Sequence, residues 1–170
     1  KPGDFILLLG SLSGSLGGSE YLKTLHGKIE GPLANFDIDY ELAVQSLCLN
    51  LIEKGIIKSA HDMSDGGLSV NIAESILHSK DESLGAKLNI ESKLRDDELL
   101  FGECQSVIIV TIREKDLITV ITEAKKSNVH TQAIGRVTND KTLSINELIS
   151  IDRNKLSKAY NNYYSNLLND

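Results

Sequence analysis

The sequence has 170 residues, of which 24 are acidic and 18 basic, and a formal charge of −6 at pH 7 with neutral histidines. Proteins that bind the nucleic-acid backbone carry a basic stripe, whereas the lysines and arginines of this chain are scattered singly among carboxylates, so the composition argues against nucleic-acid binding. The length suits one domain over residues 1–170, and no apolar run approaches the roughly 18–20 residues of a membrane span, so we expect no membrane association.

The first half of the chain alternates apolar runs typical of buried strands with segments whose apolar residues recur every three or four positions, as on one face of a helix. In chain order these patterns predict a strand over residues 5–9, a glycine-rich loop over 10–19, a helix over 20–26, a helix over 40–54, a strand over 56–61 and a helix after residue 67. Asp39 is the expected N-cap of the helix over 40–54, and Gly55 its C-terminal stop. Because the chain opens with Lys1-Pro2 instead of Met, we expect it to be a piece of a longer protein.

The second half of the chain continues the same alternation. Its patterns predict a half-buried strand over residues 86–90, an apolar strand over 107–112, a helix over 114–127, two short strands over 132–137 and 142–145, and a C-terminal helix with Leu156, Tyr160, Tyr163 and Leu167 on one face. We expect the two short strands to pair as a hairpin through the turn Asn139-Asp140. Interleaved strands and helices indicate a layered α/β or α+β domain.

The segment of greatest chemical interest follows the predicted strand over residues 56–61. It reads Asp62-Met63-Ser64-Asp65-Gly66-Gly67 and leads directly into a helix. This arrangement places backbone N–H groups and the positive end of a helix dipole at a sheet edge, where phosphate could bind. Because carboxylates in the same turn would repel bare phosphate, the pattern favours Mg²⁺ between them. The alternative is that Ser64 or Asp65 only caps the helix and that the glycines only form the turn.

Two other segments carry weaker signals. Gly17-Gly18-Ser19-Glu20 could hold an anion, but it lacks the lysine of a Walker A loop and the glycine spacing of the dinucleotide fingerprint, so an ordered surface loop is the simpler explanation. Cys104 has no histidine nearby in the sequence to activate a nucleophilic thiol, and Cys48 lies on an apolar helix face. The cysteines and histidines show no zinc-ligand spacing, and the absence of a disulfide-dense pattern predicts a reducing, cytoplasmic compartment.

Three segments together resemble one enzyme family. They are Leu16-Gly17-Gly18-Ser19-Glu20-Tyr21-Leu22, Ala60-His61-Asp62-Met63-Ser64-Asp65-Gly66-Gly67-Leu68 and Leu100-Phe101-Gly102-Glu103-Cys104-Gln105-Ser106. In this order they resemble the motifs of phosphoribosylformylglycinamidine synthase, PurL, in its second AIR-synthetase-like C-terminal domain, and the resemblance covers nearly all 170 residues. The Gly-Gly-Ser-Glu-Tyr-Leu element separates this family from AIR synthetase, selenophosphate synthetase and thiamine-phosphate kinase. The chain departs from the family pattern at Ser15, where an acidic residue is usual, and at Cys104, where serine is usual.

The resemblance implies a fold, a reaction and partners. The fold is an AIR-synthetase C-terminal-domain-like mixed sheet with packed helices. The parent enzyme uses ATP and glutamine-derived ammonia to convert formylglycinamide ribonucleotide into formylglycinamidine ribonucleotide in de novo purine biosynthesis, with Mg²⁺ and ATP or ADP as the implied cofactors. The implied partners are the rest of the same enzyme chain and, in the multi-subunit form, a glutaminase subunit and a small bridging subunit.

The resemblance also assigns roles to residues. It implies that Asp62 is a magnesium ligand, that Ser64, with Gly66 and Gly67 beside it, binds the nucleotide, and that Glu103 and Gln105 are possible equivalents of substrate-site residues. The family's catalytic histidine lies upstream of Lys1, so we expect no catalytic residue within this chain and no activity from it alone. Two alternatives stay open: a non-catalytic nucleotide-binding or interaction module, and another ATP-dependent synthetase or kinase of the same superfamily.

Overall fold

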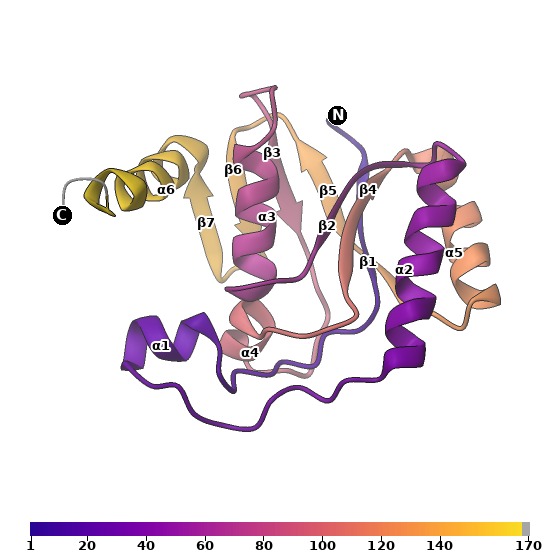
Figure 1. Cartoon of the computed structure of the whole chain (residues 1–170). Coiled ribbons are helices and arrows are strands. Elements are labelled where there is room, and N and C mark those ends of the chain that lie inside the picture. The colour runs from indigo at the N-terminus through magenta and orange to yellow at the C-terminus, as the bar shows by residue number, and fades with distance from the viewer. Residues whose placement is uncertain (168–170) are drawn as a thin grey trace.

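The computed structural model describes the backbone of residues 1–167 and the side chains of residues 1–162. Within this range the chain forms seven strands and six α-helices (Figure 1). The strands are β1 (Phe5–Leu9), β2 (Ile57–Asp62), β3 (Gly85–Leu88), β4 (Ile108–Ile112), β5 (Thr131–Thr138), β6 (Thr142–Ile145) and β7 (Ile149–Asp152). The helices are α1 (Glu20–His26), α2 (Ile38–Glu53), α3 (Gly67–Leu77), α4 (Asp96–Phe101), α5 (Leu117–Lys126) and α6 (Arg153–Leu167), with a short 3-10 turn, Glu114–Asp116, before α5.

The strands of the described range form a single sheet in the order β2-β4-β1-β5-β3-β6-β7. Neighbouring strands are antiparallel, except β3 and β6, which are parallel. The first strand of the chain, β1, therefore lies inside the sheet, between β4 and β5. The expected α/β (α+β) fold, a mixed sheet with packed helices, is confirmed.

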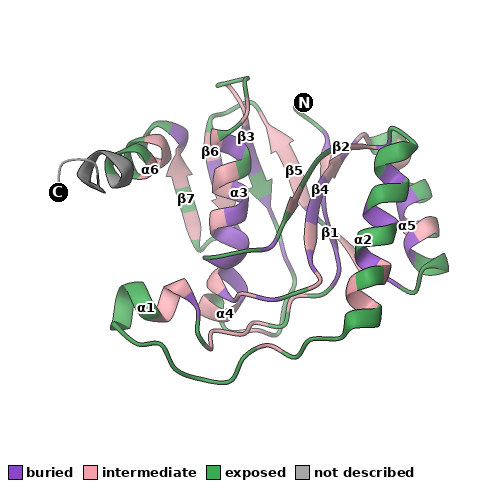
Figure 2. Ribbon diagram, in the orientation of Figure 1, coloured by how far each residue is buried: buried purple, intermediate pink, exposed green. Residues whose placement is uncertain are grey.

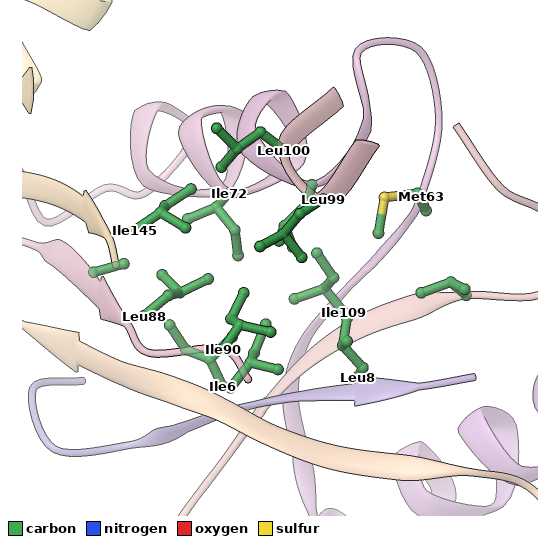
Figure 3. Packing of buried hydrophobic residues seen from close by; sticks show 14 of the residues in the cluster. Ile6, Leu8, Met63, Ile72, Leu88, Ile90, Leu99, Leu100, Ile109 and Ile145 are labelled. Carbon is green, nitrogen blue, oxygen red and sulfur yellow. The ribbon is translucent and has the colours of Figure 1, made fainter. Parts of the chain in front are cut away.

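The sheet divides the core into two layers. Along β1, Ile6 and Leu8 belong to one layer and Leu7 and Leu9 to the other, because successive side chains of a strand point to opposite faces. The helices α3 and α4 pack on the first face, and α2 and α5 pack on the second. Figure 3 shows the first layer, in which side chains of the sheet meet those of α3 and α4. The sheet is thus covered on both faces, and its strand ends are left for loops.

The expected hairpin between the strands now labelled β5 and β6 is wrong, because β3 lies between them, antiparallel to β5 and parallel to β6. The turn itself has the expected chemistry, since Asp140 Oδ1 accepts hydrogen bonds from the Thr138 hydroxyl (2.8 Å) and the Thr142 N–H (3.0 Å). Glycine at position 85 lets β3 fit beside β6, because a Cβ there would lie 2.5 Å from the Thr142 carbonyl oxygen. Local turn chemistry therefore reverses the chain without pairing the strands that it joins.

The start of α2 also differs from expectation. Its N-cap is Asp37, whose Oδ1 accepts the N–H groups of Asp39 (3.0 Å) and Tyr40 (3.1 Å), so the expected cap at Asp39 is wrong. Asp39 lies in the first turn instead, where the helix dipole favours a carboxylate. Gly55 follows the helix with a left-handed φ of 66°, as a C-terminal stop requires.

The sequence patterns do not predict the short elements α4 and β7, which have six and four residues. The predicted C-terminal helix is present as α6, and Leu156 on its expected apolar face packs against the first core layer. Tyr163 and Leu167, expected on the same face, have side chains that lie outside the described residues. None of the helices within residues 1–167 has the length and apolarity needed to cross a membrane.

Candidate functional site

The three segments that carry the resemblance meet at one end of the sheet. The start of α1, the turn between β2 and α3, and the end of α4 all lie at the lower end of the molecule in Figure 1. They are joined by one carboxylate, because Glu103 Oε1 accepts the backbone N–H groups of Glu20 (2.9 Å) and Gly66 (2.8 Å). The N–H of Glu103 in turn donates to the carbonyl oxygen of Ser15 (2.8 Å). Glu103 therefore links the start of α1, the turn before α3 and the end of α4, which are far apart in the sequence.

The turn after β2 presents its polar side chains to solvent. Asp62 and Ser64 are both exposed, and the Ser64 hydroxyl donates to Asp62 Oδ2 at 3.1 Å. The Asp62 backbone is held by a buried residue of α3, since the side-chain amide of Asn71 donates to the Asp62 carbonyl oxygen at 2.6 Å. Asn71 is 2% exposed, and its Oδ1 has no hydrogen-bond partner in the described structure. The carboxylate of Asp62 is thus oriented outward by a buried anchor.

Asn71 is a residue that the sequence analysis missed. The signal that could have found it is a polar amide between Leu68 and Ile72, on the helix face that the pattern assigns to the core. A buried polar side chain needs a hydrogen-bond partner, and here the partner is the end of the strand that carries Asp62.

Gly66 and Gly67 have steric roles in this turn. Gly66 is the N-cap of α3 with φ 80°, and the helix has no side-chain capping hydrogen bond, so the alternative in which Ser64 or Asp65 caps the helix is wrong. The N–H of Gly67 donates to the Ser64 carbonyl oxygen at 3.2 Å. A Cβ on Gly67 would lie 2.7 Å from the carbonyl oxygen of Gly102. The glycine pair therefore allows α3 to start directly against the end of α4.

The glycine-rich loop is ordered by its contacts, in agreement with the expectation of an ordered loop. Ser19 is 1% exposed and caps α1, since its hydroxyl donates to the Leu16 carbonyl oxygen (2.7 Å) and accepts from the Leu22 N–H (3.3 Å). The ring of Tyr21 stacks on that of Phe101, with 5.0 Å between centroids. This stacking adds a side-chain contact between α1 and α4 to the backbone contacts of Glu103.

The described residues offer few side-chain ligands for a metal ion. Within residues 1–167 no group of three or more His, Cys, Asp or Glu side chains is placed to hold a metal ion. Mg²⁺, however, needs only one or two carboxylates when waters and phosphate oxygens complete its shell. The exposed carboxylate of Asp62 fits an ion that arrives with a phosphate chain. Gln105 is also exposed, and Glu103 is half-buried.

Cys104 is not suited to nucleophilic chemistry. It is 4% exposed, and burial raises the pKa of its thiol, with hydrogen bonds involving Ser13 acting in the opposite direction. A thiol needs a lowered pKa or an adjacent base to react near neutral pH.

If the parent protein is the enzyme that the resemblance implies, its Cys104→Ser variant is expected to change in activity by no more than about threefold, because the unreactive thiol takes no chemical part. Steady-state turnover at matched folded protein concentration measures this effect. The buried Cys48→Ser variant serves as the control for packing changes. A loss of about a thousandfold in Cys104→Ser alone, with folding intact, would contradict the prediction and indicate a chemical role for the thiol.

Comparison with known proteins gives matches to one family and to several of its members. The family model for the C-terminal domain of AIR synthase related proteins matches residues 1–146. The PurL subunit of phosphoribosylformylglycinamidine synthase from Alkaliphilus metalliredigens is 37% identical over 137 residues, which are 81% of this chain and 18% of that protein. The same subunit from Salinibacter ruber is 41% identical over 122 residues, 71% of this chain and 16% of that protein. The match thus spans less than a fifth of the length of these relatives.

Solved structures share the fold. The structure of T. maritima PurL complexed with FGAR has a TM-score of 0.74 at 18% identity and covers 92% of this chain and 28% of its own. A thiamine-monophosphate kinase from Stenotrophomonas maltophilia has a TM-score of 0.57 at 19% identity, covering 85% of this chain and 50% of its own. At these identities the likeness concerns the arrangement of strands and helices.

Proposed function

The chain belongs to the AIR synthase related proteins through their C-terminal domain, and from this membership we propose that it is the second such domain of a PurL-type phosphoribosylformylglycinamidine synthase. The resemblance to PurL that the three motifs indicated is confirmed by the curated relatives. In this proposal the parent is a cytoplasmic ATP-dependent ligase that forms formylglycinamidine ribonucleotide from formylglycinamide ribonucleotide and ammonia. Residues 1–170 form one domain of it.

The observation that carries the proposal is the convergence of the three family segments at one end of the sheet. Glu103 joins them through hydrogen bonds from the backbone N–H groups of Glu20 and Gly66, and the stacking of Tyr21 on Phe101 adds to this contact. Solved structures of T. maritima PurL with ATP and with ADP support a nucleotide as the ligand of such a domain. We assign Asp62 as the magnesium ligand and Ser64 as a nucleotide contact.

The glycine pair would contribute shape rather than hydrogen bonds. The N–H of Gly66 already donates to Glu103, and that of Gly67 to the Ser64 carbonyl oxygen. Both glycines are buried, so their part would be to set the course of the turn that carries Asp62 and Ser64 near the positive end of the α3 dipole. Mg²⁺, when bound beside Asp62, would neutralise phosphate charge that the carboxylate alone would repel.

The domain supplies only part of the enzyme in this proposal. Catalytic residues are assigned to the rest of the parent chain, so residues 1–170 alone do not turn over substrate. Glu103 and Gln105 stay candidates for substrate-site equivalents, although Glu103 Oε1 is engaged by backbone amides. Ammonia would come from a separate glutaminase subunit with a small bridging subunit. The structure of PurLQS from T. maritima, which shares this fold, supports such an assembly.

The Asp62→Asn variant of the complete enzyme is expected to lose most of the thermal stabilisation that Mg-ADP gives the wild type. A ligand that binds only the folded state stabilises it by RT ln(1 + [L]/Kd), about 2.7 kcal/mol at a hundredfold excess over Kd. Asp65→Asn is the matched control, because Asp65 is an exposed carboxylate in the same turn. Thermal melts with and without Mg-ADP measure the difference.

Three outcomes would speak against this assignment. An unchanged nucleotide-induced shift in Asp62→Asn would show that Asp62 does not hold the ion. An equal loss of the shift in Asp65→Asn would indicate a general effect of charge in the turn. A fall in melting temperature that is the same with and without nucleotide would show that Asp62 only stabilises the turn and does not bind the ligand.

A further inference from the structure

The segment from α1 to the first turn of α2 is ordered but has no buried residue. We call residues 20–42 the arm. Every residue of the arm is exposed or half-buried, and Figure 2 shows it running along the edge of the molecule, away from the sheet. An isolated helix as short as α1 is unstable in water, so burial would ordinarily be needed to hold such a segment. Within this domain only the two ends of the arm are partly covered, where Tyr21 stacks on Phe101 and Tyr40 packs against the second core layer.

The arm nevertheless carries large apolar side chains. Of the ten that are exposed among the described residues, six belong to the arm. They are Leu25 (64% exposed), Ile29 (78%), Leu33 (79%), Phe36 (56%), Ile38 (56%) and Leu42 (53%). Single exposed apolar residues are ordinary, but a run of them along one segment marks an interaction surface.

Four of the seven charged side chains of the arm form ion pairs within it, and the other three, Asp37, Asp39 and Glu41, are acidic. Lys23 Nζ lies 2.7 Å from a Glu20 carboxylate oxygen, and Lys28 Nζ lies 3.1 Å from a Glu30 carboxylate oxygen. The surplus charge of the arm is therefore negative, which disfavours a partner that carries phosphate groups. The arm is therefore suited to an apolar protein surface rather than to nucleic acid or a phosphate group.

The arm is held in place by contacts between residues 30–32 and the glycine-rich loop. The N–H of Gly18 donates to the Glu30 carbonyl oxygen at 3.0 Å, and a Cβ on Gly17 would lie 1.9 Å from the Pro32 carbonyl oxygen. The same edge continues to Glu20, whose N–H is bound by Glu103 in the candidate site. Whatever covers the arm also borders that site.

We infer that the arm is the docking surface for the remaining part of the parent polypeptide. This inference rests on the proposal that the chain is one domain of a longer protein, and on the matched relatives, of which the alignment spans only 18%. The occupant is an apolar surface of another domain in the same chain. A second copy of residues 1–170 is the competing occupant. The predicted contact buries the six apolar side chains and closes the site from the side of α1.

Hydrogen exchange in the parent protein tests the inference. The amides of residues 20–42 are expected to exchange at least about tenfold more slowly in the parent than in the 170-residue chain, because docking must open before exchange occurs. The triple variant Ile29→Ser, Leu33→Ser, Phe36→Ser is expected to remove this protection in the parent. The matched control is Leu49→Ser, Ile52→Ser, Ile118→Ser, which changes three exposed apolar side chains outside the arm. The control is expected to keep the protection, and raising the salt concentration is expected to change it little.

The outcomes separate the occupants. Equal exchange of the arm in the parent and in the 170-residue chain would overturn the inference, as would equal effects of the two triple variants. Protection that grows with the concentration of the 170-residue chain would identify a second copy as the occupant. A steep loss of protection with salt would point to a charged partner instead. None of these measurements uses nucleotide, so they stand apart from the test of Asp62.

Discussion

Alanine at Gly67 is expected to destabilise the domain by about 3–5 kcal/mol, because the substitution combines backbone strain with a steric clash. Gly67 has φ 66°, a left-handed conformation that L-residues adopt at a cost of roughly 1–2 kcal/mol. A Cβ there would also lie 2.7 Å from the carbonyl oxygen of Gly102 and 2.7 Å from the carbonyl carbon of Phe101. Since these are backbone atoms, α3 and α4 must move apart.

Gly55 provides a matched control for this prediction. It has the same φ of 66°, but a Cβ on Gly55 would meet no heavy atom within 4 Å. Gly55→Ala should therefore show only the strain, about 1–2 kcal/mol. Urea unfolding of both variants measures the difference in the free energy of unfolding. If the two substitutions cost the same, the close packing of α3 on α4 is not what requires glycine at position 67.

Replacing Glu103 with alanine is expected to lower the free energy of unfolding by about 2–4 kcal/mol and to release α1 from the turn before α3. The substitution removes two hydrogen bonds to a charged acceptor, each contributing about 1.5–3 kcal/mol, from a half-buried site open to water. Glu103→Gln keeps an acceptor oxygen and should cost less. Amide exchange at Glu20 and Gly66 reports the release directly, and urea unfolding reports the stability.

Glu98 offers the comparison for Glu103. Its Oε2 accepts the N–H of Arg95 at 3.1 Å, a contact between residues three apart at the start of α4. Glu98→Ala is expected to cost about 1 kcal/mol and to leave the amide of Gly66 unchanged. If Glu103→Ala also leaves the amides of Glu20 and Gly66 protected, the hydrogen bonds of Glu103 are not what holds the three segments together.

The sequence predicts elements well where their pattern is local. The helix over 20–26 and the strand over 5–9 have the predicted bounds, because capping chemistry and apolar runs act over a few residues. The pairing of strands is not local. The hairpin expected between β5 and β6 follows from the turn residues alone, whereas the position of β3 depends on contacts with residues about fifty positions away.

The candidate site shows the same limit. The residues Asp62, Ser64, Gly66 and Gly67 stand out in the sequence because they share one turn. The contact of Glu103 with Glu20 and Gly66 does not, since 83 and 37 residues separate the partners and no periodicity connects them. The resemblance to a family brings the three segments together as motifs, and the structure supplies the atom that joins them.

The place of β1 inside the sheet affects how the domain can form during synthesis. Phe5–Leu9 leaves the ribosome before the other strands of the domain, yet within the described residues its partners are Ile108–Ile112 and residues of β5. At translation rates of about 5–20 residues per second, roughly 5–20 s pass before either partner is made. During that interval one of the most apolar segments of the chain has no strand to pair with. Folding of this sheet must therefore await synthesis of the second half of the domain.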